Sequence, residues 1–330
     1  MNGHGDLRDG DVVAEVEGAC FHHQAVFYAG DDEFLAGTLP FITDAVVAEE
    51  PVLVVVSEAK VELLREALGG DATPVRFADM HVLGRNPARI IPAWHQFLEE
   101  NAPDRRPVRG VGEPIWPGRS EAELAECERH EALLNLAFDG GQAWRLLCPY
   151  DLYGLEAKVI EAARRNHPFI ADHGGSRASE SYLCSDEACG PFEGALPPAP
   201  REASEIAFER EHLRMLRSSL AVWAAGELLC AERVEQLVLA VSELASNSVR
   251  YGGGRGTLRM WSEGERLLCE VFDGGHIEQP LAGRIRPTTD QHTGRGLWLV
   301  NHLCDLVQIR TGPSGNVVRV QIARDEQVGA

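Results

Sequence analysis

Two polar side chains of complementary chemistry lie four residues apart in the last third of the chain. They are Glu243 and Asn247, within SELASNSVRYGGG (residues 242–254). Apolar residues recur around them at helical spacing, which predicts a helix whose other side carries both polar groups. A carboxylate and a carboxamide one turn apart can share one binding site, although such a pair is more often part of a solvated helix face.

A second segment, VFDGGHIEQP (271–280), follows along the chain. Its apolar run predicts a strand that ends in Asp273, and Gly274 and Gly275 come next. The carboxylate could accept a hydrogen bond from a ligand, and the glycines would let that ligand approach the backbone closely. Taken alone, the segment is better explained as a turn.

A third segment, TGRGLWLV (293–300), places Gly294 and Gly296 on either side of Arg295 where a helix is about to begin. The unpaired N–H groups and the positive dipole end of a helix N-terminus suit an anion, and the arginine adds a cation. A single Gly-x-Gly before a helix is common and proves little by itself.

Together, the three segments resemble the N, G1 and G2 boxes of the Bergerat ATP-binding fold, the ATPase domain of the gyrase, Hsp90, histidine-kinase and MutL superfamily. They are most similar to the stand-alone anti-sigma-factor serine kinases of the RsbW and SpoIIAB kind, whose boxes read much like SELASNSVRYG and TGRGLWLV. The resemblance covers residues 201–325, and it implies a two-layer α+β sandwich.

The resemblance also implies roles for individual residues. Glu243 would be the general base that polarises an attacking hydroxyl, and Asn247 would hold Mg²⁺ against the phosphates of ATP. Asp273 would accept a hydrogen bond from the adenine amino group. The other residues implied in nucleotide binding are Gly275, Gly294, Arg295, Gly296 and Leu297.

The family's partners follow from the same resemblance. Its substrate is a serine on an anti-anti-sigma protein of the STAS type, and its other partner is an RNA polymerase sigma factor. The resemblance also admits a homodimer. Two alternatives stay open: a non-catalytic module that only sequesters sigma, and an orphan histidine-kinase-like protein with His212 as its candidate acceptor.

Several positions depart from the family pattern. Ser248 stands where alanine is usual, Tyr251 where histidine is frequent, and Asn316 where a threonine commonly helps to bind adenine. The second box lacks its second spaced glycine, and the segment 276–293 that would cover the nucleotide is short. These departures weaken the expectation of tight ATP binding and turnover more than the expectation of the fold.

The elements that would position these residues can be placed by periodicity. Helices are predicted over 202–225 and 232–251, followed by strands over 257–262 and 266–273. The helix led by Gly-Arg-Gly comes next, and two strands over 304–310 and 316–323 end the domain. In the last strand, valine and isoleucine alternate with Arg319 and Gln321, which predicts one core face and one solvated face.

The N-terminal part has another organisation, because short apolar runs alternate with amphipathic ones. Strands are predicted over 25–28, 51–57, 74–79, 107–114 and 143–151, and helices over 33–47, 58–68, 87–100, 120–138 and 154–166. This alternation predicts an α/β domain with a mostly parallel sheet.

Blocks of this part, among them FHHQAVFYAGDDEFLAG, GEPIWPGRS and ERHEALLNLAF, resemble the MEDS domain. This sensory module was described with the DcmR regulators and is related to KaiC/RecA-like ATPases. The resemblance spans residues 18–170 and implies sensing of a small-molecule signal. The turn AGDDEF is acidic and lacks the GxxxxGK pattern of a phosphate-binding loop, which favours a sensor over a second ATPase.

A set of polar and aromatic residues in these blocks could line the sensor's pocket. Trp116 could instead be a core residue, and Arg119 and Glu131 an ordinary ion pair. The set consists of His23, Tyr28, Glu113, Trp116, Arg119, His130 and Glu131, and the first six are the candidate pocket residues.

Composition limits the remaining possibilities. The net charge of −20 lies almost wholly before Arg201, where 34 acidic residues face 16 basic ones. Such a surface disfavours direct binding to nucleic acid or to anionic lipid. No apolar run long enough for a membrane span occurs, and the N-terminus does not look like a signal peptide, so a cytoplasmic protein is expected.

The predicted domain limits are a loose N-terminus over 1–17, the sensory domain, a linker over 171–200 rich in Pro and Ala, and the ATPase domain. The eight cysteines lack the paired spacing of a structural zinc site. Cys184 and Cys189 are the one near pair, and a plain loop explains them better than a metal or redox role.

Overall fold

The computed structural model describes residues 21–102, 106–141, 143–172, 175–183, 194–227, 229–288 and 294–324. The chain forms two compact units, Met1–Leu83 with Ala93–Ala188 and Gly84–Pro92 with Cys189–Ala330. The predictions for residues 1–17 and for Cys184 and Cys189 lie outside the described residues. Within the described part of the chain, no helix is both long enough and apolar enough to cross a membrane.

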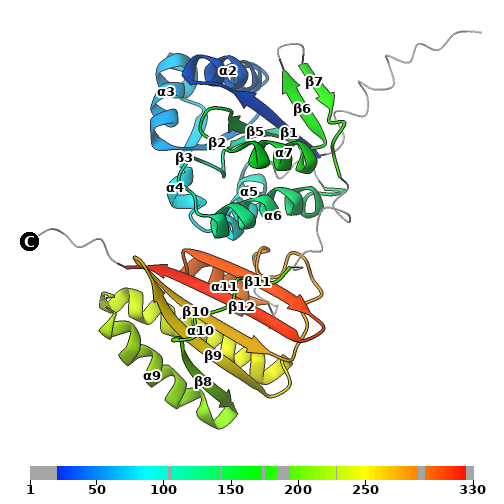
Figure 1. The fold of residues 1–330 in the computed structure, drawn as a ribbon. Coiled ribbons are helices and arrows are strands. Elements are labelled where there is room, and N and C mark those ends of the chain that lie inside the picture. Colours follow the sequence, from blue (N-terminus) through cyan, green and yellow to red (C-terminus); the bar gives the residue numbers. More distant parts are fainter. Residues whose placement is uncertain are drawn as a thin grey trace, which may run out of the picture. The chain divides into compact units, whose positions relative to one another are not determined.

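The first unit is built on a seven-stranded sheet of order β3-β2-β4-β5-β1-β6-β7 (Figure 1). The neighbouring strands are parallel except β6 and β7, which confirms the predicted, mostly parallel sheet. The strands are β1 (Phe21–Tyr28), β2 (Val52–Val56), β3 (Val75–Asp79), β4 (Val108–Gly112), β5 (Trp144–Asp151), β6 (Phe169–Asp172) and β7 (Gly175–Ala178).

Helices cover both faces of this sheet. Val111 of β4 packs in one apolar core with residues of α2 and α3. Its neighbours Gly110 and Gly112 face the other way, where an added Cβ would lie 2.9 and 3.0 Å from the Trp94 ring of α5. The helices are α2 (Asp31–Val47), α3 (Glu58–Leu68), α4 (Met80–Leu83), α5 (Ile90–Asn101), α6 (Glu121–Ala137) and α7 (Ala157–Asn166), with the short 3₁₀ turn η1 (Gly69–Ala72). A second 3₁₀ turn, η2 (Pro87–Arg89), lies in the segment Gly84–Pro92, which belongs to the second unit.

The hairpin of β6 and β7 corrects the prediction, because its second strand lies in the segment predicted as linker. Residues 169–172 pair with 175–178 in antiparallel register, and β6 also pairs with β1. The sequence GSRA of β7 is fully exposed and has no apolar alternation. Its strand conformation depends on the ladder to β6, which local sequence does not reveal.

The second unit is a two-layer α+β sandwich, as predicted. Its antiparallel sheet has the order β11-β12-β10-β9-β8, and three helices pack on one face around an apolar core (Figure 1). The strands are β8 (Ser204–Glu209), β9 (Arg255–Glu263), β10 (Arg266–Asp273), β11 (Leu306–Gly312) and β12 (Gly315–Ala323). The helices are α9 (Leu213–Gly226), α10 (Ala231–Tyr251) and α11 (Arg295–Leu303), and the 3₁₀ turn η3 (Arg210–His212) precedes α9.

The prediction of a helix from residue 202 was wrong at its start. Residues 204–209 form β8, which pairs antiparallel with β9, so a strand and not a helix begins this unit. In SEIAFE the apolar Ile206 and Phe208 alternate with Glu205 and Glu209. This period of two is the strand pattern, and only the residues from Leu213 onward continue as a helix.

The expected solvated face of β12 was also wrong, because Gln321 is only 6% exposed, and so is Arg319. Its guanidinium binds the Glu270 carboxylate at 2.5 Å, directly across the β10–β12 register. It also donates to the carbonyl oxygen of Pro197 at 2.6 Å. A charged residue can alternate with core residues and still be buried when a cross-strand partner neutralises it.

Candidate functional site

Helix α10 presents Glu243 and Asn247 toward the start of α11. The apolar side of α10 is buried against the sheet, whereas these two side chains are partly exposed. A Cβ added to Gly296 would lie 3.1 Å from Glu243 Oε2 and 3.1 Å from Asn247 Nδ2. The first turn of α11 therefore approaches both groups, and glycine leaves the space that a side chain would fill.

The N-terminus of α11 is shaped by Gly294, which has a left-handed backbone with φ of 88°. That conformation favours glycine, and nothing lies within 4 Å of the position of its missing Cβ. Arg295 is exposed, and its guanidinium donates to the carbonyl oxygen of Thr288 at 3.4 Å. Thr293, the first residue of the segment TGRGLWLV, and residues 289–292 before it lie outside the described part of the chain.

The carboxylate of Asp273, at the end of β10, accepts three hydrogen bonds. Oδ2 accepts from the Ser248 hydroxyl at 2.6 Å, and Oδ1 accepts from the Gly275 amide at 2.8 Å and from Asn316 Nδ2 at 3.2 Å. Gly252 at the end of α10 permits this packing, because its Cβ would lie 2.4 Å from Asp273 Cγ. These contacts fix the plane of the carboxylate.

A cavity of about 180 Å³ joins these elements. Ligand pockets commonly have about 300–1,000 Å³, so this volume suits one ring system rather than a whole nucleotide. Apolar side chains from α10, β10 and β12 form part of its wall. Its lining residues are Leu244, Asn247, Ser248, Tyr251, Gly252, Val271, Asp273, His276, Ile277, Gly294, Gly296, Leu297, Asn316 and Val318.

The structure thus brings the predicted nucleotide-site residues to one place. Asn247, Asp273, Gly294, Gly296 and Leu297 line the cavity. Glu243 lies beside Gly296, and Gly275 lies against Asp273 and Asn316, where its Cβ would meet them at 3.0 and 2.9 Å. Arg295 is the exception, because its described contact is to the backbone of Thr288.

Sequence reasoning missed the hydrogen-bonded support around Asp273. Thr311 on β11 donates to Asn316 Oδ1 at 2.6 Å and lies 2.9 Å from His276 Nδ1. Asn316 in turn orients its amide nitrogen toward Asp273. A signal for Ser248 was present, since it follows Leu244 by one turn in an apolar stripe, where a polar residue must find a buried partner. The fully buried Ser248 finds it in Asp273.

The candidate histidine acceptor has a structural contact. His212 is exposed in η3, and its Nδ1 accepts a hydrogen bond from the Glu209 amide at 3.2 Å. This bond satisfies a backbone donor at the start of the helical segment.

The six candidate sensor residues of the first unit fall into different contact groups. Tyr28 donates to Glu113 at 2.6 Å, and Lys60 forms an ion pair with the same carboxylate. Burial raises the pKa of both Tyr28 and Glu113, although Lys60 opposes the shift at Glu113. The sequence-based choice missed Lys60, which is far away along the chain.

A second group contains Trp116 and Arg119, whose guanidinium lies 3.5 Å from the indole centroid. Burial lowers the pKa of this arginine. Its Nε donates to the carbonyl oxygen of Pro114 at 2.8 Å. His130 is 1% exposed.

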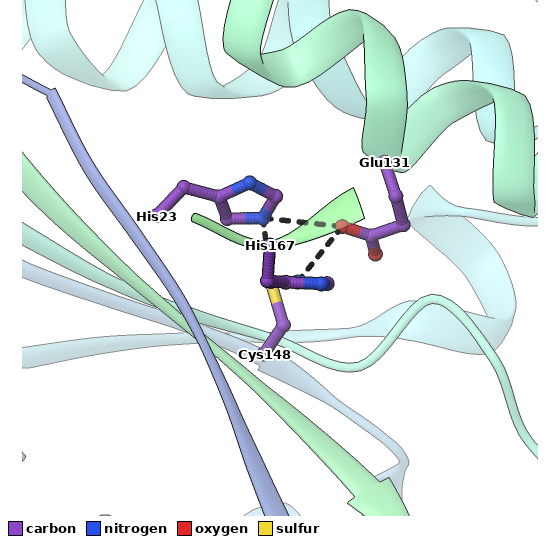
Figure 2. Close-up of side chains that lie close together, drawn as sticks. All are labelled: His23, Glu131, Cys148 and His167. Atoms are coloured by element: carbon purple, nitrogen blue, oxygen red, sulfur yellow. Dashed lines mark hydrogen bonds and ion pairs between the residues drawn. The ribbon is translucent and has the colours of Figure 1, made fainter. Parts of the chain in front are cut away.

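His23 belongs to a third group, a buried cluster with Glu131, Cys148 and His167 (Figure 2). Cys148 and His167 were not among the candidates. Strand β5 and the residue after α7 carry them, so only the fold brings them to His23.

Comparisons with known proteins agree with this division of the chain. Residues 22–168 match the family described as MEDS, the MEthanogen/methylotroph, DcmR Sensory domain. Residues 206–322 match the family described as Histidine kinase-like ATPase domain. No curated protein matches the chain.

Among solved structures, the chain is similar to the RsbU and RsbW domains of Rv1364c from Mycobacterium tuberculosis. The sequence identity is 19% and the TM-score is 0.29. The match covers 38% of this chain and 33% of that one, so the chain spans about a third of that structure's length.

Proposed function

We propose that this chain, which joins a MEDS sensory domain to a histidine kinase-like ATPase domain, is a signal-controlled anti-sigma regulator. Its C-terminal domain binds ATP with Mg²⁺ and phosphorylates a serine of an anti-anti-sigma STAS protein. The unphosphorylated STAS protein and an RNA polymerase sigma factor are its two alternative partners. The MEDS domain adjusts this activity in response to a small molecule.

One observation carries the proposal. An oriented carboxylate and an open helix N-terminus both lie at one cavity. Asp273 offers an acceptor at one end, held in place by Ser248 and Asn316. An amino-substituted aromatic ring would donate to it, and Leu244, Val271 and Val318 would pack on that ring. Adenine has this combination of features.

The other end of the site suits the phosphates. The first amides of α11 are available to an anion behind Gly294, and Asn247 supplies a carboxamide oxygen of the kind that Mg²⁺ accepts. Bound Mg²⁺ would neutralise charge on the phosphates. Glu243 lies close enough to the same helix turn to take a proton from an attacking serine hydroxyl.

The test uses the full chain, with calorimetric titration of ADP and ATP in the presence of Mg²⁺ and a phosphoryl-transfer assay with a purified STAS-domain protein. Glu243→Gln should retain nucleotide affinity within about threefold, whereas transfer should fall by about 10²–10⁴-fold, the usual contribution of a general base. The matched control is Glu235→Gln, because Glu235 is exposed on the same helix and should leave both properties unchanged.

Each result decides part of the proposal. Absence of nucleotide binding at millimolar concentration would contradict the ATP site. Binding without transfer to serine in the unaltered chain would contradict the kinase and favour control by sigma sequestration alone. An acid-labile product that is lost in His212→Ala would instead indicate a histidine kinase.

A further inference from the structure

A buried cluster in the first unit combines the side chains that bind transition metals. His23 comes from β1, Glu131 from α6 and Cys148 from β5, and His167 directly follows α7 (Figure 2). All four are at most 1% exposed, and one potential ligand atom from each lies within 4.8 Å of the others. None of them takes part in the nucleotide site.

The hydrogen bonds of the two histidines fix which ring nitrogen carries the proton. His167 Nδ1 lies 2.7 Å from the carbonyl oxygen of Ala163, which can only accept, so Nδ1 is the donor. His23 Nδ1 lies 3.0 Å from Asn135 Oδ1. The amide nitrogen of Asn135 donates to the carbonyl oxygen of Asn166, so its oxygen must face His23 and accept.

Each ring therefore directs its Nε2 into the cluster. There they meet the Glu131 carboxylate, with Oε2 at 3.2 Å from His23 Nε2 and at 3.3 Å from His167 Nε2. The Cys148 sulfur lies 3.4 Å from His23 Nε2.

The Glu131 carboxylate is left without ordinary hydrogen bonds. In the described part of the chain, neither of its oxygens nor His167 Nε2 has a hydrogen-bond partner of acceptable geometry. Burying a carboxylate costs several kcal/mol unless a positive charge lies beside it. A cation at this point would satisfy all three groups together.

We propose that His23, Glu131, Cys148 and His167 bind one divalent transition-metal ion, and that zinc is the ion the donor set fits best. Two nitrogens, one sulfur and one oxygen are ligands for zinc rather than for magnesium or calcium. Zinc bonds of about 2.0–2.3 Å place tetrahedral ligand atoms about 3.3–3.6 Å apart. The 3.2, 3.3 and 3.4 Å separations of the cluster are close to that spacing.

The surroundings of the cluster also match a metal site. Each histidine donates its other ring N–H to an oxygen, Ala163 for His167 and Asn135 for His23, as metal-binding histidines almost always do. Cys148 would bind as the thiolate and release its proton to solvent. Inside the unit, these contacts fix the rings before any ion arrives.

A cavity of about 240 Å³ reaches the cluster from one side. Glu131 and Tyr150 line it together with Ile115, Leu124 and Val159. The buried Tyr150 hydroxyl has no hydrogen-bond partner among the described residues. The cavity gives the ion a route in, and it would place a small ligand beside the metal, which is where a sensory domain could detect it.

The test is made on the full chain, stripped with a chelator under reducing conditions and then titrated with Zn²⁺ or with Co²⁺ as a spectroscopic probe. One ion should bind per chain. The cobalt form should show a thiolate-to-metal charge-transfer band together with the d–d bands of a tetrahedral ion. Cys148→Ser should remove the charge-transfer band, and His167→Gln should weaken zinc binding at least 100-fold. Asn135→Leu, which removes only the support of His23, should weaken it about 10- to 100-fold.

Matched controls distinguish this site from binding elsewhere. Cys127→Ser alters another buried free thiol. His22→Gln alters the neighbour of His23 in the chain, and the ring of His22 stacks on Phe169. Both should keep the wild-type affinity and spectrum, and circular dichroism should show that every variant is folded. No binding by the stripped wild-type chain, a cobalt spectrum without thiolate character, or unchanged binding in Cys148→Ser and His167→Gln would each overturn the proposal.

Discussion

The hydroxyl of Ser248 on α10 donates a 2.6 Å hydrogen bond to the carboxylate of Asp273 at the end of β10. This bond ties the helix of the first sequence box to the strand of the second. It occupies Oδ2, whereas Oδ1 accepts from Gly275 and Asn316. The carboxylate is therefore oriented before a ligand arrives, and its remaining acceptor capacity faces the cavity.

Asp273→Asn should weaken binding of Mg²⁺-free ADP by about 10- to 100-fold. The substitution replaces a charged acceptor by an amide, and a hydrogen bond to a charged group contributes about 1.5–3 kcal/mol. Calorimetric titration with ADP measures this loss without depending on a metal or on phosphoryl transfer.

Ser248→Ala is the matched variant for the same experiment. It removes a donor to Asp273 but leaves the charged acceptor, so affinity should change by less than about threefold, while the melting temperature falls because a buried hydrogen bond to a charged group is lost. Equal losses of affinity in both variants would show that orientation, and not the acceptor itself, determines binding.

Much of this architecture could be predicted from the sequence, because the spacing of apolar and polar residues that are close in the chain determines it. The continuous apolar run VLVVV predicted the strand β2, and the spacing of Glu243 and Asn247 placed both on one side of α10. The residues predicted for a nucleotide site could be picked out because glycine and aspartate at turns have few structural substitutes.

What local sequence did not reveal depends on partners far away in the chain. Strand β7 exists through its pairing with β6, and Arg319 is buried because Glu270 lies across the register. The buried cluster proposed to bind a metal joins residues from 23 to 167, and single histidines and cysteines at such distances carry no spacing signal. They come together only in the folded unit, where β1 and β5 carry His23 and Cys148, α6 carries Glu131 and the residue after α7 is His167.

Breaking the ion pair of Arg319 and Glu270 should destabilise the C-terminal unit strongly. Arg319→Met leaves the 4% exposed Glu270 as a buried charge without its closest cation, which costs about 3–5 kcal/mol. Urea unfolding followed by the fluorescence of Trp261, which lies under the guanidinium, would measure the loss.

The double variant Arg319→Met with Glu270→Leu completes the cycle. It should recover much of the stability, because two apolar side chains replace the ion pair without leaving a charge behind. If the single and double variants are equally unstable, packing of the arginine stem rather than charge neutralisation explains the effect.

The N-terminal unit should lose stability as the solution becomes acidic, in part through His95. Burial lowers the pKa of this histidine, with a smaller opposing effect of Glu99. The folded state thus prefers the neutral ring. Its contribution is fully present above the unfolded value of about 6.5 and is lost as pH falls through the lower folded value.

His95→Phe tests this at a site where the ring already stacks on Phe138, with centroids 4.5 Å apart. The variant should unfold with a smaller decrease in melting temperature between pH 7.5 and pH 5 than the wild type shows. Parallel decreases in the two proteins would mean that His95 does not contribute to the acid sensitivity.

The helix that carries Glu131 begins with a capping box, which gives a last test. Ser120 accepts from the Glu123 amide at 3.4 Å, and the Glu123 side chain accepts from the Ser120 amide at 2.8 Å. Ser120→Ala should cost about 1 kcal/mol, or about 2–4 °C in melting temperature for a unit of this size. Ser57→Ala is the control, because Ser57 precedes α3 without a side-chain cap and should cost less than about 0.5 kcal/mol. Glu131 lies about three turns further along α6, so zinc affinity should stay unchanged in both variants. A loss of zinc affinity in Ser120→Ala would show instead that the cap also positions the cluster.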